Sequence, residues 1–156
     1  MKTNLAMTNI LGDIEKLLSL RKIGLEPELT SILSDGIVEL DDCIFLRALL
    51  SYDFDINLAI RTAFDRTDLE CEINHIHIGD YLIQSKKSVN YLLEQGVSYA
   101  FGLQDLMSGT YNVKIILAYT LEPNIDCNIR FHKKRVGEEW LADNLEEFDE
   151  ALLVLD

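Results

Sequence analysis

Residues 88–109 read SVNYLLEQGVSYAFGLQDLMSG and decide how the rest of the chain must be arranged. Apolar residues recur in this stretch at spacings of three and four, the period of an α-helix, and Glu94 and Asp105 are its only charged residues. A helix with so few charges is usually buried on more than one side. We therefore predict a central core helix that Ser88 caps and that ends at Ser108–Gly109.

Two glycines lie inside this predicted helix. Gly96 and Gly102 lower helix propensity, so we expect them to allow the close approach of a neighbouring backbone. Polar residues interrupt the apolar run, whereas a membrane span needs roughly 20 nearly uninterrupted apolar residues. The stretch is therefore predicted to be a core helix and not a membrane anchor.

The length and composition favour one globular domain, residues 1–156, with a hydrophobic content of 48%. No N-terminal stretch has the pattern of a signal peptide, because charged residues interrupt the apolar positions from Thr8 to Ile23. Cys43, Cys71 and Cys127 are odd in number and far apart. We expect reduced, mostly buried thiols in a cytoplasmic protein.

Charge is the most informative bulk property. Acidic residues outnumber basic residues 27 to 14, which gives a net charge of −13. Twelve acidic residues and three arginines lie between Glu26 and Glu72, and eight acidic residues with no basic one lie between Glu138 and Asp156. Such a field repels nucleic acid and anionic lipid and attracts basic partners. The alternative is that the acidity serves only solubility.

The N-terminal half shows helical signals at four places. The segment from Cys43 to Leu50 is too uniformly apolar to separate a buried helix from a buried strand, but Asp41 and Asp42 before it favour a helix. The expected helices run from Thr8 to Gly24, from Pro27 to Gly36, from Asp41 to Leu50, and from Asp55 to Phe64.

The C-terminal third changes to a period of two. Residues 113–120 are apolar on both faces, as in a central strand, and residues 125–132 have one apolar and one polar face. Turn residues 122–124 join them into a β-hairpin. Residues 140–148 form a short helix or turn, and residues 151–155 form a last strand beside the hairpin. The prediction is an α+β fold: a helical N-terminal half and a long central helix packed on a small, mainly antiparallel sheet.

Residues 129–135 (IRFHKKR), 137–141 (GEEWL), 143–146 (DNLE) and 151–154 (ALLV) carry a resemblance. The pattern resembles small acidic bacterial immunity proteins of polymorphic toxin systems, including contact-dependent inhibition. In that group an Arg-Phe-His strand leads to a Gly-Glu-x-Trp-Leu-x-x-Asp-Leu-Glu turn and a terminal apolar strand; here Asn144 replaces the expected aspartate. The resemblance implies a protein that binds one toxin domain and blocks it, without catalytic residues.

His75 and His77 form the clearest alternative motif, within a segment, residues 72–78, that fits a strand or an extended connector. Two histidines on one face of a strand can form half of a metal site, which Asp80 or His132 would have to complete. Structural, hydrogen-bonded histidines are more common. A small metal-dependent enzyme is therefore the second hypothesis, and a regulatory or adaptor protein is the third.

The basic cluster Lys133–Arg135 adjoins the acidic C-terminal segment, so we expect an intramolecular match of charge. Trp140, the only tryptophan, is either a core anchor under the last strand or an anchor in an interface. The first hypothesis is a non-enzymatic immunity protein, without cofactor or metal, that occludes a basic toxin domain, with a nuclease as the favoured toxin class. The predicted partner-binding residues are Glu139, Trp140, Asp143, Glu146, Glu147, Asp149 and Glu150.

Overall fold

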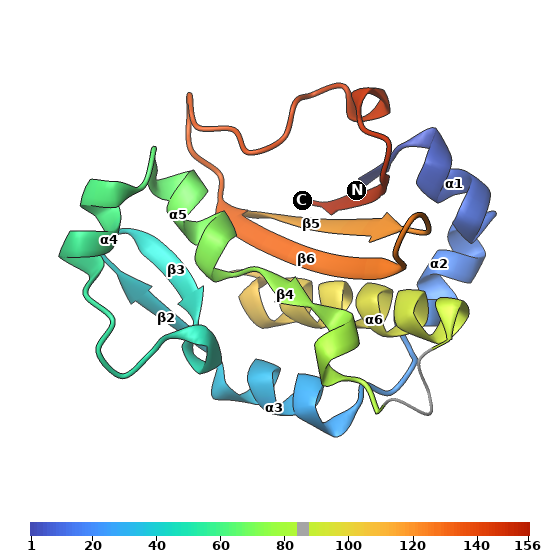
Figure 1. Ribbon diagram of the computed structural model, residues 1–156, viewed down its shortest axis with the longest axis horizontal. Helices are drawn as coiled ribbons and strands as arrows, with labels where there is room; N and C mark the ends of the chain where they lie inside the picture. Colours follow the sequence, from blue (N-terminus) through green and yellow to red (C-terminus); the bar gives the residue numbers. More distant parts are fainter. Residues whose placement is uncertain (84–87) are drawn as a thin grey trace.

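The computed structural model describes residues 1–83 and 88–156 (Figure 1). Within these ranges the chain forms six α-helices, a five-stranded antiparallel sheet, and a separate two-stranded sheet at one end. The long helix α6 (Val89–Met107) lies along one face of the larger sheet. The predicted α+β class, with a central helix on a largely C-terminal sheet, is confirmed.

Helix α6 begins as the sequence predicts. The Ser88 side chain accepts a hydrogen bond from the backbone N–H of Tyr91, and the helix ends at Met107 before Ser108. Eleven of its residues are buried. Val89, the first residue of the helix, is 40% exposed, because it stands in the first turn at the edge of a surface hollow.

The five strands of the larger sheet come from both ends of the chain. The strand order is β1-β7-β5-β6-β4, and every neighbouring pair is antiparallel. The hairpin and the last strand are confirmed, and the short edge strand β4 lies inside residues 72–78, predicted to be a strand or an extended connector, whereas β1 was not predicted. The strands are β1 (Lys2–Thr3), β4 (Ile76–His77), β5 (Val113–Thr120), β6 (Asp126–Lys133) and β7 (Ala151–Leu155).

The two glycines of α6 lie at tight contacts. A Cβ atom on Gly96 would lie 2.3 Å from the Cys127 Sγ atom of β6, and one on Gly102 would lie 2.8 Å from Leu33 Cδ1. Real Cβ atoms essentially never come within 3.0 Å of another heavy atom. Both glycines therefore lie at close contacts, but the prediction of a neighbouring backbone is wrong, because the nearest atoms belong to side chains.

The first predicted helix is in fact two helices, α1 (Leu5–Leu11) and α2 (Ile14–Leu20). Gly12 ends α1 with a φ of +83°, a conformation that glycine adopts without strain. Asn4 caps α1 in place of Thr8, and Asp13 caps α2. Helix α3 (Pro27–Asp35) follows the sequence prediction.

The prediction of a helix from Asp41 to Leu50 is wrong. The chain forms a hairpin of β2 (Ile37–Leu40) and β3 (Cys43–Leu46), followed by a 3₁₀ turn. Asp41 and Asp42 are the two turn residues, with φ values of +48° and +65°. The apolar run is a strand buried on both faces, because Cys43 and Phe45 pack into one hydrophobic cluster and Ile44 and Leu46 into another.

Two further helices complete the fold. Asp55 caps α4 (Ile56–Thr62), as predicted, and α5 (Arg66–Ile73) was not predicted. The connector before the central helix is therefore shorter than expected, with only β4 as strand. We call β2, β3, α4 and α5 the lobe (Figure 1). In the part of the chain that the structure describes, no helix is long and apolar enough to cross a membrane.

Candidate partner-binding surface

Residues 138–150, here called the arch, cross the face of the sheet opposite α6 (Figure 1). Leu141 packs with Ile116 of β5 and Leu152 of β7 in a small hydrophobic cluster. Half-buried side chains of the arch surround this cluster. The arch is therefore held against the sheet by apolar contacts while its polar side chains face solvent. The half-buried members from the arch are Trp140, Leu145 and Phe148.

Trp140 is half-buried and performs a structural role. Its ring packs against the small cluster under the arch, and the Arg130 guanidinium lies 5.3 Å from the ring centre. An Arg over a Trp face is a favourable cation–π arrangement. The core-anchor interpretation of Trp140 accounts for these contacts, and part of the ring stays accessible.

Three of the acidic side chains that we selected from the sequence have partners within the molecule. Glu139 forms an ion pair with Lys114 at 2.6 Å, and this hydrogen bond lowers the pKa of Glu139. Both carboxylate oxygens of Glu146 accept from the backbone N–H of Leu5, at 2.9 and 3.1 Å. Glu147 accepts a hydrogen bond from Asn144 at 3.1 Å.

Five carboxylates of the arch have no basic group within 4 Å in the ranges that the structure describes. All five side chains are exposed. Most of the acidic residues that we selected from the sequence are therefore exposed along the arch. The five are Asp143, Glu146, Glu147, Asp149 and Glu150.

Asn4 anchors the far end of the arch. Its buried amide donates to the backbone oxygen of Glu150 at 2.7 Å, and its Oδ1 accepts from the backbone N–H groups of Met7 and Leu152. One side chain thus joins the N-terminal helix, the arch and β7. Nothing in the sequence indicates this role, because an asparagine before a helix predicts only a cap.

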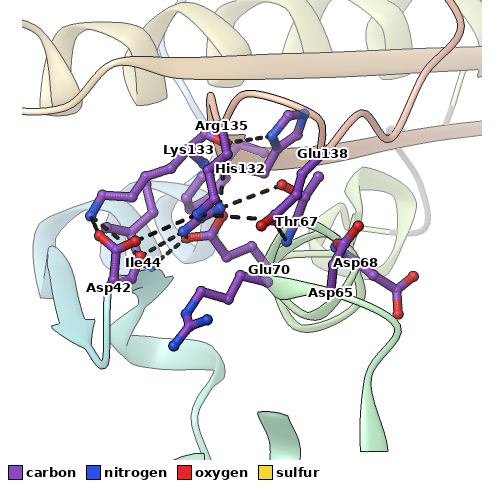
Figure 2. A network of polar contacts seen from close by, with 12 residues as sticks. Asp42, Ile44, Asp65, Thr67, Asp68, Glu70, His132, Lys133, Arg135 and Glu138 are labelled. Carbon is purple, nitrogen blue, oxygen red and sulfur yellow. Dashed lines mark hydrogen bonds and ion pairs between the residues drawn. The ribbon is translucent and has the colours of Figure 1, made fainter.

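The basic cluster Lys133–Arg135 at the end of β6 forms ion pairs with acidic residues, as expected. Most of these acidic residues lie in the lobe and not in the acidic C-terminal segment. Figure 2 shows Lys133 and Arg135 directed toward the lobe. Lys133 Nζ lies 2.7 Å from Glu39 and 2.6 Å from Asp42. The C-terminal segment contributes Glu138, 4.0 Å from Arg135, and Asp156, 3.3 Å from Lys134.

Glu70, which sequence analysis missed, is the centre of this network (Figure 2). Its side chain is completely buried, and Arg135 donates to its two oxygens at 2.7 and 3.0 Å. The backbone N–H groups of Ile44 and Lys133 also donate to it, at 2.7 and 2.9 Å. Four donors therefore satisfy the hydrogen-bonding capacity of the Glu70 carboxylate. The Glu70–Arg135 pair joins three segments of the chain, and these contacts account for Glu70 as a structural residue.

The pKa shifts of the ionisable groups in this network follow from their contacts. Burial by itself would lower the pKa of Arg135, but the hydrogen bonds and charge of Glu70 outweigh burial and raise it. The hydrogen bond from Lys133 lowers the pKa of Asp42. Burial, together with the charge of Glu70, raises the pKa of Cys43 to about 11.

His75 and His77 do lie together, with ring centres 4.3 Å apart. Arg130 donates to His75 Nδ1 at 3.1 Å, so this nitrogen is an acceptor. Burial and the Arg130 charge lower the pKa of His75 to about 4. His77 Nδ1 contacts Asp126 at 3.1 Å, a carboxylate that we did not select.

The two residues proposed to complete a metal site have other surroundings. His132 is buried and its Nδ1 contacts its neighbour's carbonyl at 2.7 Å. Asp80 is exposed and lines a hollow of about 530 Å³ with His77 and Asp126. In residues 1–83 and 88–156, no three or more His, Cys, Asp or Glu residues are grouped so that they could hold a metal ion.

The three cysteines lie in separate parts of the core. Cys43, Cys71 and Cys127 are all buried, as predicted, and none is in a disulfide. Burial raises the pKa of Cys71 and of Cys127 far above the ordinary value. Such thiols stay protonated and do not act as nucleophiles at neutral pH.

Comparison with known proteins gives one family. No curated protein and no solved structure matches the chain. A family model, described as the Uncharacterized protein PM0498 family, matches residues 2–156. The match covers nearly the whole chain and includes both the arch and the lobe. The protein therefore belongs to the PM0498 family.

Proposed function

We propose that this protein is an immunity protein that binds a basic toxin domain and neutralises it by stoichiometric occlusion. The observation that carries the proposal is the arch, with five exposed carboxylates that lack a basic partner among the described residues. The resemblance of residues 129–154 to immunity proteins points to the same function.

The arch suits electrostatic recognition. A surface of one charge speeds association with an oppositely charged partner, and buried contacts then slow dissociation. Nucleases are the favoured toxin class, because their clefts are basic to hold phosphates. An acidic surface that fills such a cleft competes directly with the nucleic acid.

The arch is also fixed to the fold before any partner arrives. Asn4 holds the backbone at Glu150, Glu146 accepts from the N-terminus of α1, and Leu141 is buried against the sheet. A surface that is already ordered loses less conformational entropy on binding. The arch can therefore present its charges in one arrangement.

The test uses a toxin domain, sought first in the genes adjacent to the one that encodes this protein. Production of that domain in bacteria should stop growth, and co-production of this protein should restore it. Titration of the purified pair should show a 1:1 complex. Growth arrest without rescue, together with no binding in the titration, would contradict the proposal.

A charge-reversed variant locates the interface. Asp143→Lys with Asp149→Lys should slow association at low salt and have less effect at high salt, because the Debye length falls below ~10 Å. Asp35→Lys with Asp53→Lys is the matched control, since it changes the net charge equally at exposed sites away from the arch. Equal slowing by the two variants would show that only net charge matters and would move the interface elsewhere.

Trp140→Ala separates the two interpretations of the tryptophan. The contacts with Arg130 and the small cluster predict a lower melting temperature. Faster dissociation from the toxin domain without a change in melting temperature would instead make Trp140 an interface anchor.

A further inference from the structure

Two large apolar side chains are almost fully exposed at one corner of the molecule. Phe64 is 93% exposed and Val136 is 106% exposed. Single exposed apolar residues are common and need no explanation. These two differ because they stand on turns that the fold brings together.

The corner forms at the N-terminal end of α5. The Glu138 carboxylate accepts from the backbone N–H of Thr67 at 3.1 Å, and an isolated bridge pairs Arg135 with Glu138. Phe64 lies three residues before Thr67, and Val136 lies between the bridged residues. Figure 1 shows the two turns side by side beside α5.

A network of buried polar contacts supports the corner. The buried Glu70–Arg135 pair lies directly under it, and Figure 2 shows the Thr67, Glu138 and Asp42 side chains gathered around that pair. These buried contacts hold both turns in one conformation before a partner binds. Less conformational entropy is therefore lost on association.

The corner is also acidic. Asp41 and Asp42 form the two-residue turn of the β2–β3 hairpin, with φ values of +48° and +65°, the left-handed conformation that such turns require. Residues 39–42, 64–70 and 133–138 carry seven carboxylates and four basic side chains, an excess of three negative charges. Apolar side chains with an acidic surround are complementary to an apolar patch with a basic surround.

We propose that this corner is the docking surface for the basic toxin domain, with Phe64 and Val136 as its apolar anchors. This assignment rests on the proposed function and adds which residues hold the partner after the charges have steered it. The corner is continuous with the arch, because Glu138 belongs to both. Anchors of this kind govern dissociation, whereas rim charges govern association.

The experiment measures the binding kinetics of the same toxin domain by surface plasmon resonance. Phe64→Ser and Val136→Ser should each speed dissociation by at least about tenfold, with nearly unchanged association, as for truncated interface anchors. Tyr52→Ser is the matched control, since Tyr52 is 107% exposed at the other end of α4. Melting temperatures of all three variants should equal that of the wild type.

The outcomes separate the two proposals. If the wild type binds but neither Phe64→Ser nor Val136→Ser changes dissociation more than Tyr52→Ser, this assignment is wrong and the proposed function stands. If the wild type does not bind the domain at all, both proposals fail. Faster dissociation confined to the two corner variants supports both.

Discussion

The core under α6 and the lobe are held together by different interactions. Helix α6 has eleven buried residues, whereas α4 has none. The hydrophobic cluster of the lobe has three buried members, Cys43, Phe45 and Leu69, surrounded by half-buried side chains. The lobe contacts the sheet through two buried side chains of β3, Ile44 and Leu46, which belong to the main hydrophobic cluster, and through buried polar groups of α5 and of the residue after it. The comparison shows that a small layer with little apolar burial of its own can be fixed by a few buried contacts, both apolar and polar.

Asn74 and Glu70 make those contacts. Asn74 accepts from the backbone N–H of Leu46 at 3.0 Å and donates to the carbonyl of Ile44 at 2.8 Å. It also donates to the carbonyl of Phe131 at 3.3 Å, which links the lobe to β6. Both side chains are completely buried. Loss of either one leaves backbone groups without partners, and that is more costly than the loss of an exposed pair.

The largest expected effect is therefore at Glu70. Glu70→Ala removes the buried carboxylate that accepts two hydrogen bonds from the Arg135 guanidinium and leaves the backbone N–H groups of Ile44 and Lys133 without their acceptor, which should lower the free energy of unfolding by about 3–5 kcal/mol. Arg66→Ala is the control, because Arg66 and Asp41 form an exposed pair that should contribute about 0–1 kcal/mol. Urea denaturation measures both. Equal small losses would show that the lobe does not depend on Glu70.

Two leucines of equal exposure compare the apolar parts directly. Leu93 and Leu69 are each 6% exposed, one in the core under α6 and one in the lobe. Leu93→Ala should cost about 3–5 kcal/mol and Leu69→Ala about 2–3 kcal/mol, since half-buried neighbours collapse more easily into a cavity. Urea denaturation of the pair gives the difference. A larger loss at Leu69 would reverse the comparison.

The tight contact at Gly96 should give a smaller loss. The added methyl group of Gly96→Ala meets the buried Cys127 side chain, and overpacking of this kind costs about 1–3 kcal/mol. Gly102→Ala should cost less, because it meets the flexible end of the Leu33 side chain. Thermal unfolding compares the two. A stabilised Gly96→Ala variant would mean that helix propensity outweighs the contact.

The smallest effect concerns pH. The pKa of His75 is lowered to about 4 in the folded protein, against about 6.5 in an unfolded chain. The unfolded state binds more protons between these values, so the contribution of His75 to stability falls as pH decreases from about 6.5 to 4. His75→Gln should have a shallower dependence of melting temperature on pH across this range. Parallel curves for the two proteins would exclude this role of His75.

The sequence predicted the elements whose signals are local. The helix after Ser88 and the C-terminal hairpin follow from periodicity, and the Asp55 cap follows from side-chain type. The Asp41–Asp42 turn was misassigned because aspartates favour a helix start as well as a turn, and a strand buried on both faces has no alternation to reveal it.

The network at Glu70 could not be predicted for a different reason. Its members, such as Asp42 and Arg135, are far apart in the sequence, and any acidic residue among 27 could have matched the basic cluster. The acidic candidates of the arch were predictable from composition alone. Their joint exposure depends on Asn4 and Leu141, whose long-range contacts carry no local signal.

Hydrogen–deuterium exchange of the protein with and without the toxin domain tests the central claim, that the arch and the corner beside it bind the partner. The account predicts slower exchange of backbone amides in residues 138–150 and 64–68 on complex formation, with no change in α6. Binding that slows exchange only elsewhere, for example around the hollow at His77 and Asp80, would contradict it.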